Sequence, residues 1–394
     1  MSVSVSDRMT RVKPSATGAV LARAKALKAA GQDIISLGAG EPDFDTPVAI
    51  RQAAIAAIED GKTRYTAIDG TPELKSAIQH KFHRENSLQF DTSDIVVSSG
   101  AKQCIFNAAL ALLGPGDEAV IPAPYWVSYP DIVRLADGTP VIMETGLEEG
   151  FKITPEQLAS HLTGKTRLLI LNSPSNPCGI AYTEQEQRAL GEVLEDYPSV
   201  AVISDEIYEH IHWAPSPFIS FAAACPALAD RTVTVNGVSK AYAMTGWRIG
   251  YAGGPSGLIS AMKTVQSQST SNPCSVSQAA AVEALNGDQT AVTEMVAEYR
   301  ERHDAVVALL RNIPGFECRE GDGTFYLLPR VSGAIELLGL RSDLEFAELL
   351  IEKAGVATVP GTPFGAPGYL RLSFASSMEE LTQALERIKR AVPA

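Results

Sequence analysis

Short apolar segments rich in β-branched residues alternate with longer stretches of helical periodicity between about residues 95 and 255. Apolar runs of this kind are typical of strands that are buried on both faces, as in a parallel sheet. The stretches between them, such as residues 102–113 and residues 184–194 after the possible N-cap Thr183, fit crossover helices. We therefore predict an α/β fold with a mostly parallel central sheet and helices on both faces. The predicted strands cover residues 95–97, 118–121, 167–171, 200–203 and 232–235.

The pattern changes after about residue 300. A long charged helix passes through residues 300–303, strand-like segments follow at residues 324–328 and 369–374, and an amphipathic helix reaches the end of the chain. This order is typical of a smaller α+β domain. We predict an N-terminal arm that also contributes to the small domain, a large ligand-binding domain and a small C-terminal domain. Their predicted bounds are residues 1–46, 47–300 and 301–394.

The composition is that of a folded protein, because 45% of the residues are hydrophobic and only 20% are charged. The length of 394 residues suits about two domains. The net charge of −13 argues against a nucleic-acid-binding surface, which needs clustered Lys and Arg. The five cysteines form no C-x-x-C pair, the N-terminus lacks the apolar core of a signal peptide, and no apolar run is long enough to span a bilayer. We therefore expect a cytoplasmic protein, with neither nucleic acid nor membrane as a partner.

Three polar side chains come after the ends of three predicted strands: Asn176, Asp205 and Lys240. If those strands are parallel neighbours, their carboxyl ends meet at one edge of the sheet, which is where ligands bind in open α/β folds. An amide, a carboxylate and an amine are then expected to converge at this edge.

The segment SKAYAMTGWRIG at residues 239–250 indicates what they bind. The amine of Lys240 can hold an aldehyde as an imine and move a proton. The guanidinium of Arg248, eight residues later, offers a planar and permanently charged fork for a phosphate. An aldehyde and a phosphate in one molecule describe pyridoxal phosphate, although either residue alone is more often a solvated surface charge.

Other residues fit parts of the same cofactor. Asp205 can keep a pyridine nitrogen protonated, so that the ring absorbs electrons when a substrate loses its α-proton. Asn176 and Tyr208 can hydrogen-bond the ring hydroxyl, and Trp126 can stack on the ring. Singly, each also has an ordinary explanation as a turn Asn, an N-cap Asp or a core aromatic residue.

Residues 98–103 lie between a predicted strand and a predicted helix. The start of a helix leaves backbone N–H groups unpaired at its positive end, which suits a phosphate. Gly100, Ala101 and Lys102 are therefore candidate phosphate contacts, although many strand-to-helix loops with a glycine look similar.

Two further motifs are weaker. GAGEP at residues 38–42 lacks the third glycine of a dinucleotide-binding motif, and Pro42 and Pro47 break any helix there. His210 and His212 form an H-x-H pair, but no third ligand lies nearby in the sequence. We predict neither a Rossmann site nor a metal site.

Taken together, these motifs closely resemble those of the fold-type-I pyridoxal phosphate enzymes, and within them the class I aminotransferases of the bacterial aspartate aminotransferase type. The resemblance covers nearly the whole chain. Its motifs lie at residues 13–17, 38–44, 122–126, 172–179, 205–208 and 239–250.

The resemblance implies roles for matching residues. Lys240 corresponds to the Schiff-base lysine and proton shuttle, and Arg371 to the arginine that grips the substrate α-carboxylate, with Gly40, Trp126 and Asn176 also near the substrate. Tyr65 resembles the tyrosine that reaches the cofactor phosphate of the neighbouring subunit, which implies a homodimer with shared sites. The chain departs from many relatives at Gly237, where they place a phosphate-binding serine.

The substrate is less narrowly defined by these motifs. Thr17 and Lys102 resemble residues that recognise the distal carboxylate of aspartate, glutamate or prephenate in this subgroup, so we expect an amino donor of this class and a 2-oxo acid acceptor. An aromatic or broad-specificity aminotransferase and a carbon–sulfur β-lyase are alternatives, because the side-chain pocket decides the outcome. A non-catalytic regulator is disfavoured, since the chain has no basic segment for DNA binding. A scaffold protein would leave the polar residues at the strand ends unexplained.

Overall fold

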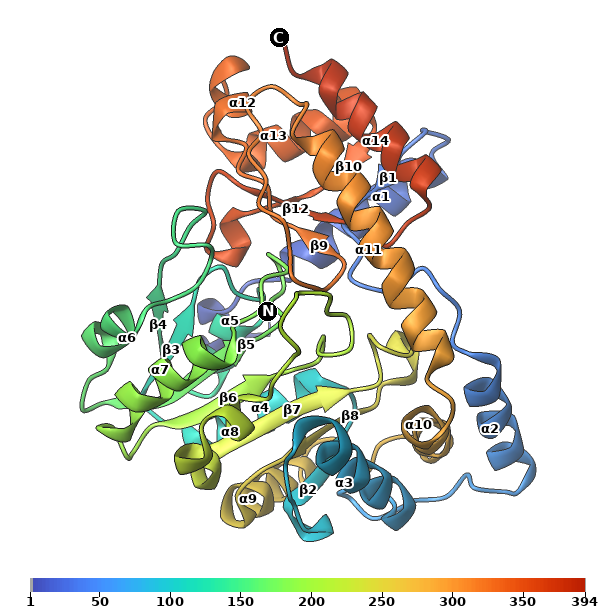
Figure 1. Cartoon of the computed structure of the whole chain (residues 1–394), viewed down its shortest axis with the longest axis vertical. Helices are drawn as coiled ribbons and strands as arrows, with labels where there is room; N and C mark the ends of the chain where they lie inside the picture. The colour runs from blue at the N-terminus through green and yellow to red at the C-terminus, as the bar shows by residue number, and fades with distance from the viewer. Residues whose placement is uncertain (1–2, 394) are drawn as a thin grey trace.

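The computed structural model describes residues 3–393. A seven-stranded sheet lies at its centre, and its mostly parallel strands confirm the predicted fold class (Figure 1). Only β8 runs against its neighbours, which are β2 and β7. In order across the sheet, the strands are β2 (Ile95–Ser98), β8 (Gly250–Gly253), β7 (Thr232–Gly237), β6 (Ala201–Asp205), β5 (Thr166–Asn172), β3 (Glu118–Pro122) and β4 (Thr139–Met143).

Helices cover both faces of this sheet. One face packs against α4 (Ala101–Leu112), α5 (Tyr129–Leu135) and α9 (Ser256–Ser267). The other packs against α6 (Pro155–His161), α7 (Glu184–Glu195) and α8 (Phe221–Ala224), and nearer β2 against α2 (Val48–Glu59), α3 (Pro72–Asn86) and α10 (Ser275–Asn286).

Burial on both faces explains why the strands read as unbroken apolar runs. Successive side chains of a strand point to opposite faces. The neighbours Val202 and Ile203 accordingly belong to different hydrophobic cores on the two sides of β6.

A second, smaller part lies at the top of Figure 1 and contains about the C-terminal quarter of the chain. Its antiparallel sheet has the order β11 (Val359–Pro360), β12 (Leu370–Ser373), β9 (Tyr326–Leu327), and β1 (Ile35–Ser36) pairs with β10 (Val356–Ala357). The N-terminal segment therefore packs with the C-terminal part. The helices here are α1 (Ala16–Ala29), α11 (Thr290–Leu310), α12 (Ser332–Leu337), α13 (Asp343–Leu349) and α14 (Met378–Ala391).

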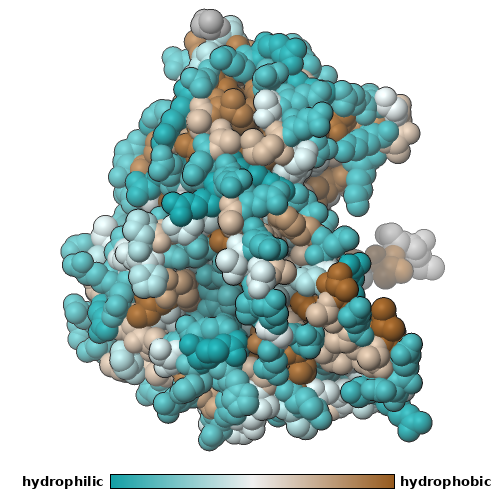
Figure 2. All heavy atoms as spheres, turned by 45° about the vertical axis from the view of Figure 1, so that its right-hand side comes forward, coloured by the Kyte–Doolittle hydropathy of each residue, from teal (hydrophilic) through white to brown (hydrophobic). Residues whose placement is uncertain are grey.

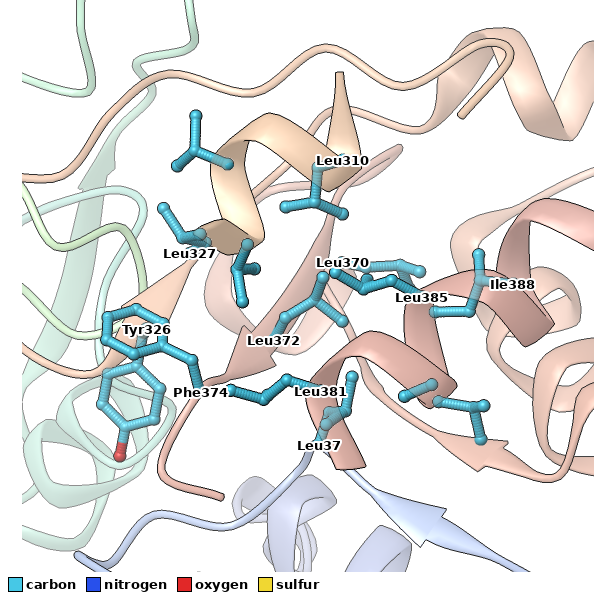
Figure 3. Close-up of a cluster of buried hydrophobic side chains, with 14 of the residues drawn as sticks. Leu37, Leu310, Tyr326, Leu327, Leu370, Leu372, Phe374, Leu381, Leu385 and Ile388 are labelled. Atoms are coloured by element: carbon cyan, nitrogen blue, oxygen red, sulfur yellow. The ribbon is translucent and has the colours of Figure 1, made fainter. Parts of the chain in front are cut away.

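The smaller part has its own hydrophobic core, drawn in Figure 3. Leu381, Leu385 and Ile388 recur at spacings of four and three residues, so they share one face of α14 and pack on β12. The hydroxyl oxygen of Tyr326 points away from these leucines. The division at residues 46 and 300 stays a prediction, because α11 crosses residue 300 without a break.

All five predicted strands of the large sheet are present, but β4 and β8 were not predicted. β4 begins Thr139-Pro140, and a proline demotes a strand signal except at a sheet edge, which is where β4 lies. β8 has glycine at both ends, and glycine weakens the same signal.

The surface drawn in Figure 2 is mostly hydrophilic, and its hydrophobic atoms occur in small groups. Among the exposed apolar side chains are Val48, Ile55 and Ile58 of α2, and Tyr65 after that helix. No helix within residues 3–393 combines the length and the apolar character needed to cross a bilayer.

We expect Gly250→Ala to lower the free energy of unfolding by about 3 kcal/mol, because overpacking against rigid backbone is costly. A Cβ atom at Gly250 would lie 2.0 Å from the backbone nitrogen of Ala101. Gly257→Ala is the control, since no atom lies within 4 Å of its Cβ position and its helical site should gain about 0.5–1 kcal/mol. Urea unfolding of both variants measures the difference, and equal stabilities would contradict the packing described here.

Candidate active site

A cavity of about 400 Å³ opens where the carboxyl ends of β5, β6 and β7 face the smaller part of the chain. Parallel strands in this register bring their last residues side by side, so Asn172 of β5 pairs with Asp205 of β6. Residues distant in the sequence line this one space. They include Thr17, Gly40, Glu41, Ala101, Lys102, Trp126, Tyr129, Asn172, Asn176, Asp205, Tyr208, Lys240, Arg248, Tyr326 and Arg371.

Lys240 follows β7 and extends its amine into the cavity. Its Nζ donates a hydrogen bond to the Gly40 carbonyl oxygen at 2.6 Å and lies 5.7 Å from the ring centre of Tyr208. Burial, and then the positive charge of Arg371, lowers the pKa of Lys240 to about 8. A much larger share of this amine is therefore neutral near pH 7 than for an exposed lysine, and a neutral amine can act as a nucleophile or accept a proton.

Asp205 is the last residue of β6 and is 4% exposed. Tyr129, on the first turn of α5, donates its hydroxyl proton to Asp205 Oδ2 at 2.6 Å. Burial raises the pKa of Asp205 to about 6, and the hydrogen bond from Tyr129 opposes this increase. The carboxylate thus has a fixed orientation and titrates close to neutral pH.

Arg371 of β12 joins the two parts of the chain at the cavity. It is 2% exposed, and its Nη1 and Nη2 donate to Asn176 Oδ1 at 3.1 Å and to the Gly38 carbonyl oxygen at 2.9 Å. Its Nε has no hydrogen-bond partner within the described part of the chain. The guanidinium lies 4.3 Å from the ring centre of Tyr326. A buried cation with a free N–H suits the bidentate binding of a carboxylate.

Arg248 and the start of α4 form another side of the site. Arg248 has a left-handed backbone, with φ of 56°, and its Nη1 and Nη2 donate to the carbonyl oxygens of Thr245 at 2.9 Å and Ser99 at 3.3 Å. A Cβ atom on Gly100 would lie 2.3 Å from Arg248 Nη2, so only glycine lets the guanidinium approach this backbone. The first N–H groups of α4 and the Arg248 charge thus lie together, which suits an anion.

Lys102 and Trp126 lie on the same side of the cavity. Lys102 Nζ lies 4.7 Å from the centre of the Trp126 ring, and burial, then the charge of Arg248, lowers the pKa of Lys102. Trp126 in turn meets Tyr129 edge to face, with ring centres 5.4 Å apart.

The structure brings together nearly all of the residues predicted from the sequence. Gly100 adjoins the cavity through Arg248, whereas Tyr65 is 93% exposed and does not line the cavity of its own chain. At Gly237 a Cβ atom would lie 3.0 Å from Gly250 Cα, so close packing against β8 leaves little room for the serine of many relatives.

The lining residues that sequence reasoning missed include four with polar side chains near the predicted ones: Glu41, Tyr129, Asn172 and Tyr326. Asn172 and Glu41 stand in motifs that the sequence analysis singled out, but no role was assigned to them. Tyr129 follows Trp126 by three residues, and this helical spacing was an available signal. Tyr326 gave none, since it belongs to an apolar strand of the smaller part.

Comparison with known proteins identifies the family. The model for aminotransferase class I and II matches residues 32–388. The chain belongs to the class I and II aminotransferases. This confirms the resemblance noted in the sequence, and members of this family generally depend on pyridoxal phosphate.

Relatives and solved structures agree with this assignment. The aminotransferase is 53% identical over 390 residues to an aspartate/prephenate aminotransferase of Nitrosomonas europaea, with 98% of each chain covered. It matches the crystal structure of an aspartate aminotransferase from Rhizobium meliloti at a TM-score of 0.95 and 48% identity, covering 99% of each chain. An aspartate aminotransferase of Thermus thermophilus, solved with maleate, matches at a TM-score of 0.93 and 42% identity, covering 99% of this chain and 100% of the other.

We expect Tyr129→Phe to raise the pKa of Asp205 above its value of about 6. The increase should be about one to two pH units, because a hydrogen bond to a charged group contributes about 1.5–3 kcal/mol. Titration of the Asp205 side-chain ¹³C resonance measures the change. Tyr125→Phe is the control, since that half-buried tyrosine belongs to the same segment but makes no hydrogen bond to Asp205 in residues 3–393. Equal titration curves for the two variants would show that the Tyr129 hydroxyl has no effect.

Proposed function

We propose that this aminotransferase moves an amino group between a dicarboxylic L-amino acid, aspartate or glutamate, and a 2-oxo acid, with prephenate and arogenate as a further pair. The convergence of Lys240, Asp205 and Arg371 on one cavity carries the proposal. It supplies an amine of lowered pKa, an acid of raised pKa and a buried guanidinium, and transamination needs one of each.

Pyridoxal phosphate fits the donors of this cavity. Lys240 would hold its aldehyde carbon, Asp205 its ring nitrogen, and Tyr208 and Asn176 its ring oxygen, while Trp126 would cover the ring. The phosphate would lie between Arg248 and the backbone of Gly100, Ala101 and Lys102, where glycine leaves the backbone accessible. When bound, this cofactor supplies an electron sink for the electrons left when the substrate α-carbon loses a proton.

Lys240, Asp205 and Arg371 each have a separate role in this reaction. The Lys240 Nζ, neutral in part because of its lowered pKa, would accept the proton that the substrate α-carbon loses. Asp205, oriented by Tyr129, stays ionised above about pH 6 and can hold a proton on the ring nitrogen. Arg371 binds the substrate α-carboxylate, and its pairing with Asn176 fixes the orientation of the guanidinium.

Charge in the cavity favours an anionic substrate. Lys102, Lys240, Arg248 and Arg371 outnumber the acidic Glu41 and Asp205 there, although the whole chain carries a net charge of −13. We assign the distal carboxylate to Lys102, with Thr17 nearby. The Nitrosomonas relative is named for aspartate and prephenate, and maleate, found with the Thermus enzyme, is a dicarboxylate.

We further propose a cytoplasmic homodimer with shared active sites. Tyr65 is almost fully exposed, and the apolar side chains of Val48, Ile55 and Ile58 in α2 are more than half exposed, which suits a surface that a second copy covers. In that dimer the partner subunit's Tyr65 would reach the phosphate side of the cavity. All five cysteines are unpaired, as expected in a reducing compartment.

The function is tested by mixing the purified protein, loaded with pyridoxal phosphate, with a panel of L-amino acids and recording the cofactor absorbance. Aspartate and glutamate should convert the aldehyde form to the amine form, and Lys240→Ala should abolish turnover, because it removes the proton carrier. Release of pyruvate and ammonia would instead indicate a β-lyase. Conversion by aromatic amino acids alone would indicate an aromatic aminotransferase.

We expect Lys102→Ala to lower kcat/KM for aspartate and glutamate about 10- to 100-fold, since a charge-assisted hydrogen bond contributes about 1.5–3 kcal/mol. Alanine, which has no distal carboxylate, should lose about twofold or less. Lys28→Ala, an exposed lysine of α1, is the control and should change neither. Steady-state kinetics with each donor measures the effect, and an equal loss for alanine would refute the assignment of Lys102.

A further inference from the structure

The segment that follows β6 points its side chains in two directions. Asp205 and Tyr208 line the cavity, whereas Glu206 and Glu209 do not line it and are 1% and 7% exposed. Two buried glutamates thus lie behind two residues of the site. Their contacts hold the same short segment that carries Asp205 and Tyr208.

Within residues 3–393, the side chain of Glu206 accepts all of its hydrogen bonds on one oxygen, Oε1. The hydroxyls of Ser204 and Ser220, each at 2.8 Å, and the backbone N–H of Phe221, at 3.1 Å, all donate to Oε1. Glu206 Oε2 has no partner within residues 3–393, and neither does Oε1 of Gln187. Both residues line a small cavity of about 10 Å³, which is about the space of one water molecule. One oxygen that accepts three hydrogen bonds, and a second oxygen without a partner on a residue that shares a small cavity with an unpaired acceptor, suit a protonated carboxyl group.

Glu209 has the opposite surroundings. The ammonium of Lys81, itself fully buried, forms an ion pair with Glu209 Oε1, and Asn86 Nδ2 donates to Oε2. Lys81 Nζ also donates to Asn86 Oδ1 at 2.6 Å and lies 3.6 Å from Glu85 Oε2. A buried ammonium of this kind requires an ionised partner.

His210 completes this cluster. Its Nε2 lies 2.9 Å from Glu85 and its Nδ1 lies 3.6 Å from Glu209. Glu85, Glu209 and His210 come close enough together to hold a metal ion, but Lys81 already supplies a positive charge to both carboxylates. His212, the other member of the H-x-H pair, is not part of this group.

The pKa shifts of the two glutamates agree with a neutral Glu206 and an ionised Glu209. Burial, and then repulsion by Glu209, raises the pKa of Glu206 to about 8. Burial also opposes the ionisation of Glu209, but Lys81 and His210 outweigh it and lower the pKa of Glu209. Among the described residues that line the small cavity, Tyr182 is the other titratable one, and Asp205 is the chain neighbour of Glu206; neither can offset a negative charge.

We propose that Glu206 and Glu209 are positioning residues of opposite charge state, a neutral carboxylic acid and an ionised carboxylate, which together fix the turn that presents Asp205 and Tyr208. The proposal rests on the proposed function, since it takes Asp205 and Tyr208 as cofactor contacts. Because Glu206 is neutral, it places no second negative charge next to Asp205.

The test compares E206Q, E206A and E209Q, with E192Q on the exposed face of α7 as the control. Glutamine imitates a protonated glutamate, so E206Q should keep the pH midpoint of the absorbance of bound pyridoxal phosphate and bind the cofactor within about twofold of wild type. E206A loses the hydrogen bonds and E209Q loses the ion pair, so both should shift that midpoint and bind at least about tenfold more weakly.

Stability reports the charge of Glu206 independently of the cofactor. A raised pKa in the folded state means that wild type loses stability as the pH rises from about 4.5 to about 8, because folding then opposes deprotonation. E206Q lacks this loss. In the full-length chain without cofactor, the Tm of E206Q relative to wild type should therefore rise between about pH 5 and pH 8.5.

Two results would overturn the proposal. One is an E206Q variant as impaired as E209Q, with no rise in relative Tm, which would mean that Glu206 is ionised. The other is a set of variants that lower Tm but leave the absorbance midpoint and cofactor affinity unchanged, which would mean a structural role alone. If E209Q does not fold, the double variant Lys81→Met with Glu209→Gln, which buries no unpaired charge, replaces it. A wild-type protein that binds no pyridoxal phosphate would refute the proposed function, whereas the Tm series would still decide the charge of Glu206.

Discussion

Parallel pairing between β5, β6 and β7 is the constraint on which the site depends. In this register Asn172 faces Asp205 across the strand pair, and the Asn172 side chain then donates to the Asp205 carbonyl oxygen at 2.9 Å and accepts from the Asn176 backbone N–H at 2.8 Å. A slip by one residue would turn Asp205 to the opposite face of the sheet. The apolar cores on both faces make such a slip costly, so hydrophobic burial sets the position of the polar groups.

Burial also sets the charge of those groups. It lowers the pKa of Lys240 from an ordinary value of 10.5 to about 8 and raises that of Asp205 from 3.8 to about 6. The pKa values of this amine and this carboxyl group, which differ widely in water, therefore both lie close to neutral pH. Groups that exchange protons in catalysis need pKa values in this range. The hydrogen bond from the Tyr129 hydroxyl limits the increase in the pKa of Asp205, and the negative charge of Glu41 limits the decrease in the pKa of Lys240.

Much of this arrangement was predictable because strands buried on both faces appear in the sequence as apolar runs, and because Asn176, Asp205 and Lys240 lie at or shortly after the ends of such runs. β4 and β8 were not, since proline and glycine weaken the strand signal where tertiary pairing overrides it. The direction of a side chain in an irregular turn was not predictable either. Asp205 and Glu206 are neighbours with similar chemistry, yet one faces the cavity and the other a pair of serines. Only packing against other elements distinguishes them.

The contacts of Arg371 have a consequence for ligand design. Two of its N–H groups already donate to Asn176 Oδ1 and to the Gly38 carbonyl oxygen. These two acceptors lie on opposite sides of the boundary between the two parts of the chain. An inhibitor that displaces both would also loosen the link between these parts. One that reaches the remaining Nε and leaves Asn176 in place would keep that link intact, so selectivity among related compounds should depend on the angle at which their carboxylate arrives.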